Sequence, residues 1–339
     1  MSKQTQHILV IRLSAMGDVA MSVPVLRALT TQYPHLKVTV LTRPFFEPFF
    51  RDLDQVSVYD ADLKGEHKGV FGLYKLSKSL KKLNIDAVAD IHNVLRSKIL
   101  KIFFLGTSFA QIDKGRSEKK ALISGSVFKQ LPSTVERYAE VFKDLGFPVD
   151  LSNPTFAASA VLSEKLLAIT GSHDKKWIGI APFAAHDSKM YPINLMETVI
   201  ETLSKEYKVF LFGGGAKEVE VLNGFQSKFK NVINLAGQLN FNEELDIISN
   251  LDVMLSMDSG NGHMAAMLGK KVISIWGVTH PFAGFAPFNQ PSDYTLTASR
   301  EEFPLIPTSI YGNKFPEGYE KASGTIVPET IVNKIISVI

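Results

Sequence analysis

Short apolar runs of four to seven residues alternate with amphipathic stretches along the chain, and this series occurs twice. The alternation is typical of β-α units that build a parallel sheet. In the first half, the predicted strands are residues 7–13, 37–42, 55–60, 86–90 and 109–112, with helices at 19–31, 73–82 and 134–145. In the second half, the predicted strands are residues 177–181, 208–212, 232–235, 252–256 and 271–276, with helices at 194–206, 216–228, 242–250 and 262–268.

Two domains are predicted because 339 residues exceed the size at which a single core usually stops growing. The pattern breaks at residues 150–154, and the second series begins at Trp177. We therefore expect α/β architecture with doubly wound domains at 1–165 and 166–325, facing each other across a cleft. Residues 326–339 form a final helix, for which packing back on the N-terminal domain is one option. Ligands are expected at the carboxyl ends of the strands.

Composition excludes several classes of protein. The chain has no cysteine, so disulfide frameworks, zinc-thiolate sites and thiol nucleophiles are excluded. Its net charge of +3, from 37 basic and 34 acidic residues, is far below that of a dedicated nucleic-acid binder. No stretch reaches the roughly 18 apolar residues of a membrane-spanning helix. The polar start, residues 1–7, and the short apolar run after it do not resemble a signal peptide, so a cytoplasmic location is expected.

Basic residues are concentrated in one portion of the first half, with few acids among them. The favoured interpretation is a set of solvated helix faces, and the alternative is a surface for an anionic acceptor or an anionic membrane leaflet. These residues are Lys75, Lys78, Lys81, Lys82, Arg96, Lys98, Lys101, Lys114, Arg116, Lys119 and Lys120.

The first candidate motif follows the first predicted strand and runs from Arg12 to Asp18, including Ser14, Met16 and Gly17. A helix is expected to open near Asp18, and an N-cap carboxylate there would satisfy free backbone amides. We give this interpretation more weight than a catalytic role, although a general base is also needed at such a strand end. Only one glycine is present, which disfavours a dinucleotide fingerprint.

Two further loops carry weaker signals. Lys189 is the only cation of the loop at 181–192 and could neutralise a leaving diphosphate, although an exposed loop lysine without a partner is the more frequent case. Three glycines at 213–215 precede a helix that contains Glu218. This loop could approach a nucleotide, with Glu218 on the ribose hydroxyls, or it could be an ordinary β-α turn.

The strongest motif runs from residue 257 to residue 269 and includes Asp258, Ser259, Gly260, Gly262 and His263. An apolar strand brings Asp258 to the edge of the sheet, and a helix then begins with its free amides exposed to a ligand. Such a helix start is a site for a pyrophosphate. A plain helix cap with a buried histidine is the less favoured interpretation.

In this order, the four segments resemble the bacterial ADP-heptose:lipopolysaccharide heptosyltransferases over nearly the whole chain. The segment at 12–18 matches that family's K/R-x-S-x-x-G-D. Residues 258–269 with 277–281 match its D-T/S-G-x-x-H-L-A-A-x-L-G and G-x-T-x-P. The resemblance implies the GT-B fold, an inverting transfer of heptose from a nucleotide-diphosphate sugar such as ADP-heptose, and a lipopolysaccharide core or lipid A acceptor. It implies neither a catalytic metal nor a cofactor.

The resemblance also implies roles for individual residues. Asp18 would be the catalytic base, and Ser14, Met16 and Gly17 would lie on the acceptor side in the N-terminal domain. The donor would be bound by the C-terminal domain through Lys189, Glu218, Asp258, Ser259, Gly260, Gly262 and His263. A peripheral contact with the cytoplasmic face of the inner membrane would follow from a lipid-anchored acceptor.

The chain departs from the family pattern at Met190 and Tyr191, where arginine and tryptophan are usual, and at Met264, where leucine is common. The missing arginine leaves the identity of the donor open. The alternatives are a GT-B nucleotide-sugar epimerase, a non-catalytic nucleotide-sugar-binding protein and, weakened by the missing glycine fingerprint, a nicotinamide dehydrogenase.

Overall fold

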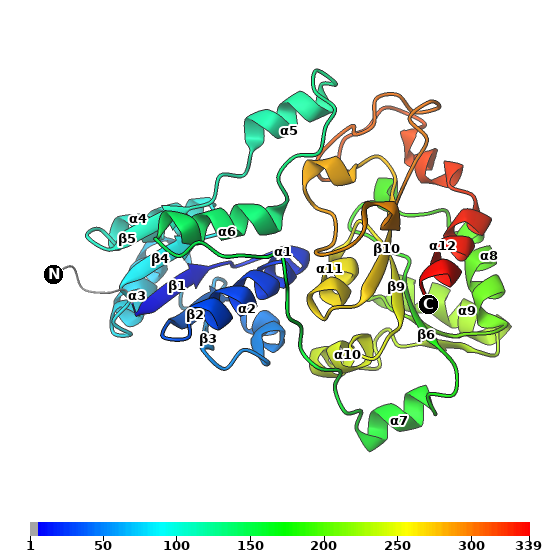
Figure 1. Cartoon of the computed structure of the whole chain (residues 1–339), viewed down its shortest axis with the longest axis horizontal. Helices are drawn as coiled ribbons and strands as arrows, with labels where there is room; N and C mark the ends of the chain where they lie inside the picture. The colour runs from blue at the N-terminus through cyan, green and yellow to red at the C-terminus, as the bar shows by residue number, and fades with distance from the viewer. Residues whose placement is uncertain (1–5) are drawn as a thin grey trace. The chain divides into compact units, whose positions relative to one another are not determined.

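The computed structural model describes residues 6–339, so most of the polar start used to expect a cytoplasmic location lies outside the described residues. The chain forms two compact units, which are coloured along the sequence in Figure 1. Unit 1 comprises the described residues up to Arg116 together with Thr134–Phe156. Unit 2 comprises Ser117–Ser133 and Ala157–Ile339. The structure thus differs from the predicted division at residue 165 in two segments, Ser117–Ser133 and residues 157–165, which both belong to unit 2.

Unit 1 is built on a parallel sheet with the strand order β3-β2-β1-β4-β5. Its strands are β1 (His7–Ile11), β2 (Lys37–Thr42), β3 (Val56–Asp60), β4 (Ala87–Asp90) and β5 (Ser108–Gln111). Its helices are α1 (Met16–Ala20), α2 (Ser22–Gln32), the 3-10 helix η1 (Pro44–Phe50), α3 (Gly69–Lys81), α4 (Leu95–Phe103) and α6 (Thr134–Asp144). Helix α4 was not predicted, and the single helix predicted at 19–31 is interrupted at Met21.

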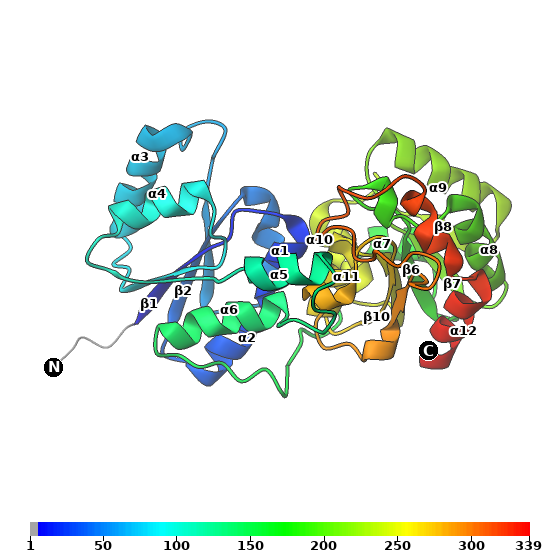
Figure 2. The ribbon, with the colours of Figure 1, turned by 90° about the horizontal axis from the view of Figure 1, so that it is seen from above.

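Helices cover both faces of this sheet, with α3 and α4 on one side and α2 and α6 on the other (Figure 2). All five side chains of β1 are buried, as expected for a central parallel strand. Leu9 and Ile11 of β1 pack with Leu73 and Leu76 of α3 and with Leu100 of α4. These contacts fix the start of the loop that follows β1.

Unit 2 is a second parallel sheet with the order β11-β10-β9-β6-β7-β8. Its strands are β6 (Trp177–Ala181), β7 (Lys208–Leu211), β8 (Val232–Asn234), β9 (Val253–Met257), β10 (Lys271–Trp276) and β11 (Thr295–Thr297). Its helices are α7 (Glu164–Thr170), α8 (Ile193–Ser204), α9 (Ala216–Lys228), α10 (Phe241–Ile248), α11 (Gly260–Met267) and α12 (Pro328–Val338), with 3-10 helices η2 (Asp187–Lys189), η3 (Pro281–Ala283), η4 (Ser292–Tyr294) and η5 (Tyr319–Thr325). Counted within each unit, the strand order is therefore 3-2-1-4-5 in unit 1 and 3-2-1-4-5-6 in unit 2, which is the Rossmann-like arrangement.

The C-terminal helix α12 belongs to unit 2. Its side chains Ile331 and Ile335 are fully buried in the same core as Met196 and Ile200 of α8. The apolar face of α12 therefore completes the core of unit 2. None of the helices among residues 6–339 is long and apolar enough to span a bilayer.

Segment Ser117–Ser133, which contains most of helix α5 (Arg116–Ile123), also belongs to unit 2 although it lies between β5 and α6 in the sequence. Leu122 and Leu131 form an apolar cluster with Ala283. The backbone N–H of Leu131 donates to the carbonyl of Phe282 at 2.9 Å. Gly284 lies so close to this segment that an added Cβ would be 2.5 Å from the Pro132 carbonyl oxygen. Backbone contacts, rather than a sequence motif, therefore determine that this segment belongs to unit 2.

Candidate functional site

Both candidate aspartates follow strands that meet at the switch point of their own sheet. In unit 1 the strand order reverses between β1 and β4, so this pair marks the switch point. There Ile11 of β1 pairs with Asp90 of β4. In unit 2 the same point lies between β6 and β9, where Ala181 pairs with Ser256. Ligands of open α/β sheets bind outside the carboxyl ends of the strands at this position.

Asp18 is the third residue of α1 and not its N-cap. Helix α1 begins at Met16 with Ala15 as its cap, so the interpretation of Asp18 as an N-cap is wrong. The carboxylate folds back instead, and its Oδ2 accepts a hydrogen bond from the Ala15 N–H at 3.3 Å. Ser14, Met16 and Gly17 form the partly exposed turn around it.

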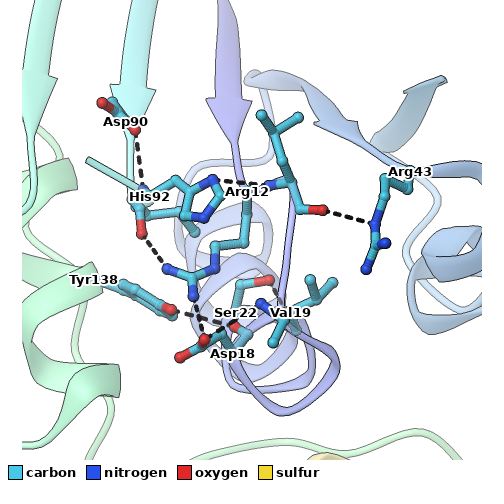
Figure 3. Close-up of polar contacts among 11 residues, drawn as sticks. Arg12, Asp18, Val19, Ser22, Arg43, Asp90, His92 and Tyr138 are labelled. Atoms are coloured by element: carbon cyan, nitrogen blue, oxygen red, sulfur yellow. Dashed lines mark hydrogen bonds and ion pairs between the residues drawn. The ribbon is translucent and has the colours of Figure 1, made fainter. Parts of the chain in front are cut away.

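The side chain of Arg12 points toward the Asp18 carboxylate (Figure 3). Its buried guanidinium pairs with Asp18 Oδ2 and donates to the Ile91 carbonyl at 2.8 Å. The Tyr138 hydroxyl donates to the Asp18 carbonyl at 3.2 Å. Among the described residues, the contacts of the Asp18 side chain all use Oδ2, so its other oxygen remains available to a ligand.

The loop after β4 completes this part of unit 1. Asp90 is fully buried and accepts hydrogen bonds from the backbone N–H groups of His92 and Asn93 and from Gln111 at 2.6 Å. This turn directs His92 toward Leu13, whose N–H donates to Nδ1 at 3.3 Å (Figure 3). Burial, with Arg12, Lys114 and Arg96 nearby, lowers the pKa of His92 to about 3. The imidazole is therefore neutral, with its proton on Nε2.

Cations accumulate beside Asp18. The pKa of Lys114 is lowered by burial and by repulsion from Arg12 and Arg116, and it is raised in part by Asp18 and Asp90. A positive group surrounded by other positive groups is stabilised by an incoming anion. This part of unit 1 is therefore suited to a ligand that carries negative charge.

In unit 2, Asp258 organises the loops at the ends of β6, β9 and β10. It is 8% exposed, and its Oδ2 accepts from Lys189 Nζ at 2.8 Å and from Thr279 Oγ1 at 2.8 Å. The Asp258 backbone N–H donates to the Ile275 carbonyl at 3.1 Å. The aspartate thus holds the lysine in place and neutralises it in part, and the two groups form a buried ion pair.

Two glycines shape the space around Lys189. An added Cβ at Gly312 would be 2.6 Å from Lys189 Cγ, and one at Gly277 would be 2.6 Å from the Ser188 carbonyl oxygen. Gly312 also has a φ of +79°, which other residues rarely adopt. Ser188 is buried and its hydroxyl donates to the Gly312 carbonyl. Lys189 is therefore a constrained side chain, and the interpretation as a loop lysine without a partner is wrong.

Helix α11 begins at Gly260, two residues before the predicted start, with Ser259 as its N-cap. Ser259 makes no side-chain cap hydrogen bond, and its hydroxyl lies 3.0 Å from Ser256 Oγ instead. Gly262 allows close packing, since an added Cβ would be 3.3 Å from Ser256 Oγ. His263 is buried in the first turn of the helix. The first amides and the positive end of the helix dipole therefore suit an anion.

Glu218 closes the glycine loop after β7. Its Oε2 accepts from the Gly214 N–H at 2.7 Å, and Gly213 leaves room for the carboxylate. Glu218 thus fixes the conformation of the loop. As an acid in the first turn of α9, it also interacts favourably with the helix dipole.

The structure explains one of the three departures from the family pattern. Tyr191 is 2% exposed, lies in the core of unit 2 and donates its hydroxyl to the Ile326 carbonyl at 2.5 Å. It is a packing residue in this chain. Met190 is partly buried, and its carbonyl accepts from Ser323 Oγ at 2.8 Å.

Sequence reasoning missed several residues of these sites. Thr279 was noted only as part of a motif, and His92 and Gly312 carried no motif at all. For His92, the available signal was its position just after Asp90 at the end of a buried strand. Gly312 lies in a long irregular segment, and its role depends on contacts distant in sequence.

Two Rossmann-like units in series, each with polar loops at its switch point, define a GT-B protein. Solved structures agree. A glycosyl transferase family 9 structure from Veillonella parvula matches with a TM-score of 0.78 at 18% identity, covering 100% of this chain and 98% of that chain. Escherichia coli heptosyltransferase WaaC with ADP-2-deoxy-2-fluoro heptose matches with a TM-score of 0.69 at 18% identity, covering 98% and 99%.

Sequence comparison identifies the family. The profile of glycosyltransferase family 9 (heptosyltransferase) matches residues 73–302. Lipooligosaccharide heptosyltransferase 2 of Haemophilus influenzae is 28% identical over 81% of this chain and 84% of its own length. The chain belongs to glycosyltransferase family 9, the heptosyltransferases, and is a glycosyltransferase.

Proposed function

We propose that this protein transfers a heptose from ADP-heptose to a lipopolysaccharide core or lipid A acceptor, with inversion at the anomeric carbon. The names of its relatives support the acceptor class, and the ligand named with the WaaC structure supports the donor class. The observation that carries the proposal is the constrained cation Lys189, held by Asp258 and Thr279 in the same unit as the start of α11.

The donor is bound by unit 2. The diphosphate accepts hydrogen bonds from the first amides of α11, near Ser259, Gly260 and Gly262, while Lys189 approaches it as a point charge. Asp258 is compatible with a nearby diphosphate because its charge is already compensated by Lys189. Negative charge on the leaving diphosphate is thus stabilised where it develops, which is usually the largest contribution to such catalysis.

Three residues complete the proposed donor site. His263 lies near the sugar or phosphates from the first turn of α11. Glu218 and the glycine loop approach the nucleotide, with Glu218 acting through the loop backbone that it holds. Tyr191 contributes only packing.

Unit 1 supplies the base. The acceptor hydroxyl oxygen forms a bond to the anomeric carbon as the bond from that carbon to the donor phosphate oxygen breaks, and the free oxygen of Asp18 takes the hydroxyl proton. Arg12 fixes the carboxylate through its other oxygen. Ser14, Met16 and Gly17 flank the acceptor hydroxyl, and the cation Lys114 attracts an anionic acceptor such as a phosphorylated core. General base catalysis of this kind contributes about 10²- to 10⁴-fold.

We expect the reaction to need no metal and no cofactor, because Lys189 and the α11 amides supply the positive charge for the diphosphate. The partners are then the nucleotide-sugar and the lipid-anchored acceptor, without nucleic acid. Because such an acceptor is embedded in a membrane, we place the protein at the cytoplasmic face of the inner membrane.

A transfer assay tests the proposal. The protein is incubated with ADP-heptose, a UDP-sugar or a GDP-sugar, each with and without a lipid A core acceptor, and the free nucleotide and glycosylated lipid are quantified. We expect ADP and heptosylated lipid in equal amounts, only with ADP-heptose and only with acceptor. Conversion of the nucleotide-sugar to its epimer without acceptor would instead support an epimerase, and binding without turnover would support a non-catalytic protein.

A further inference from the structure

The outer faces of α3 and α4 carry large apolar side chains that the protein leaves exposed. Phe71 of α3 is 71% exposed, Leu95 and Ile102 of α4 are 74% and 62% exposed, and Leu105 just after α4 is 81% exposed. Val70 and Tyr74 of α3 are also exposed. Isolated exposed apolar residues are ordinary, but a concentration on two adjacent helices indicates an interaction surface.

These two helices lie side by side on one face of the unit 1 sheet (Figure 2). Their inner residues, among them Leu73, Leu76 and Leu100, are buried in the core of that unit. The outer residues therefore project away from the sheet, and Leu95, Ile102 and Leu105 follow one another at helical spacing. We name the exposed side chains of α3, α4 and residue 105 the α3–α4 surface.

Lysines surround these apolar residues. Lys75 lies over the Phe71 ring at 5.3 Å, and Lys78 lies over the Tyr74 ring at 4.7 Å. Lys98 and Lys101 of α4 are exposed beside Leu95 and Ile102 in the sequence. Long lysine side chains can lay their methylene groups along apolar groups while the ammonium remains in water or among anionic headgroups.

Few acidic residues lie in this stretch to balance the lysines. Residues 67–107 contain Lys68, Lys75, Lys78, Lys81, Lys82, Arg96, Lys98 and Lys101, but only the acids Asp86 and Asp90. Asp86 accepts from the backbone N–H of His7, and Asp90 is fully buried among its own hydrogen bonds. The surface is therefore both apolar and positively charged.

We propose that the α3–α4 surface binds an anionic phospholipid bilayer, with the apolar side chains inserting between headgroups and the lysines contacting the anionic lipids. Charge complementarity favours this occupant, because an amphipathic helical face rich in lysine and bearing large apolar residues is the composition of interfacial membrane binders. A soluble polyanion would be recognised by the lysines alone. This proposal rests on the proposed function only in one respect, which is that membrane binding would bring the enzyme to a membrane-embedded acceptor.

Co-sedimentation with vesicles tests this surface without donor or acceptor, so failure of the proposed function cannot alter the result. The full chain is mixed with vesicles of phosphatidylcholine alone or of phosphatidylcholine with phosphatidylglycerol.

Three matched variants are compared after thermal unfolding has shown that each is folded. The apolar variant is Phe71→Ser, Leu95→Ser and Ile102→Ser. The charge variant is Lys75→Gln, Lys78→Gln, Lys98→Gln and Lys101→Gln. The control, with the same net charge as the charge variant, is Lys205→Gln, Lys230→Gln, Lys314→Gln and Lys321→Gln, all exposed in unit 2.

The expected result is binding to anionic vesicles and little binding to neutral ones, weakened at least about tenfold in the apolar and charge variants but not in the control. Absence of binding to anionic vesicles overturns the proposal, as does an equal loss in the control. Binding that the apolar variant retains in full also overturns it, because the surface would then be a site for a soluble polyanion such as a nucleic acid or an acidic protein.

Discussion

Asp258 and Lys189 form a buried ion pair of 2.8 Å that joins the loop after β6 to the end of β9. The lysine is held on one side by the carboxylate and on the other by the close approach of Gly312 to its stem. Under the proposed function the pair therefore has two separable roles, which are to stabilise the folded loops and to position a cation for the donor diphosphate. Each role can be measured alone.

Lys189→Met should weaken both donor binding and stability. Loss of a charged hydrogen-bond donor costs about 1.5–3 kcal/mol, which corresponds to about 10- to 100-fold in the Kd for ADP-heptose. The remaining Asp258 carboxylate is buried without its cation, which costs about 3–5 kcal/mol of stability. Calorimetric titration and urea unfolding measure the two effects.

The double variant Lys189→Met with Asp258→Asn separates the effect on donor binding from the effect on stability. We expect most of the lost stability to return, because no unpaired charge remains, while donor binding stays weak. Restored donor binding would contradict the role of Lys189 as a phosphate ligand.

Gly277→Ala tests whether the loop after β10 must approach the Lys189 loop this closely. The added methyl group would lie 2.6 Å from the Ser188 carbonyl oxygen, so the loops must separate. We expect a loss of roughly 1–3 kcal/mol in unfolding free energy, as for other overpacked sites. Gly224→Ala within α9 is the control, because nothing lies within 4 Å of its added Cβ. There the expected change is a gain of up to about 1 kcal/mol.

His92 makes unit 1 sensitive to acid. Its pKa is about 3 in the folded protein, against an ordinary value of 6.5, so the unfolded chain binds the proton first as pH falls. The stability that depends on neutral His92 is therefore complete above about pH 6.5 and is lost progressively toward pH 3, by up to about 1.4 kcal/mol per pH unit.

His92→Asn offers the Leu13 N–H an acceptor without this titration. Its Tm should fall less steeply than that of the unsubstituted protein between pH 6.5 and pH 4.5. His280 of unit 2, whose pKa is lowered to about 4 by burial and by Arg300, is present in both proteins and does not affect the difference. Parallel slopes would show that His92 is not the responsible group.

Lys114→Gln should raise the KM for an anionic acceptor by about tenfold or more, because it removes one charged contact. The KM for the donor should not change. Lys143→Gln, on an exposed lysine paired with Glu140 at the end of α6, is the matched control. An unchanged acceptor KM in the Lys114 variant, measured by initial rates, would remove this residue from the acceptor site.

The periodicity of the sequence predicted most of the fold because parallel strands buried on both faces are continuous apolar runs. Residues 177–181 and 271–276, for example, are the observed bounds of β6 and β10. The segment Ser117–Ser133 could not be assigned to unit 2, since its place depends on contacts of Leu122 and Leu131 with residues more than a hundred positions away. The same limit applies to the site, where motifs indicated Asp258 and Lys189 but not their pairing.

The helix starts show a second limit. Asp18 was expected to be an N-cap because acids are frequent there and accept from amides of the first helical turn. In the structure it is the third helical residue, and its carboxylate accepts instead from the N–H of the N-cap residue Ala15. Sequence alone does not distinguish these arrangements. The distinction affects function, because the observed arrangement leaves one carboxylate oxygen available to a ligand.

The assignment of Asp18 as the base is tested most directly by the turnover of Asp18→Asn, measured as acceptor-dependent heptose transfer alongside donor affinity and thermal unfolding. The amide keeps the shape of the side chain but cannot accept the hydroxyl proton. We predict that kcat falls about 10²- to 10⁴-fold while donor affinity is unchanged and the variant remains folded. Near-normal turnover by a folded Asp18→Asn protein that binds donor normally would contradict the assignment.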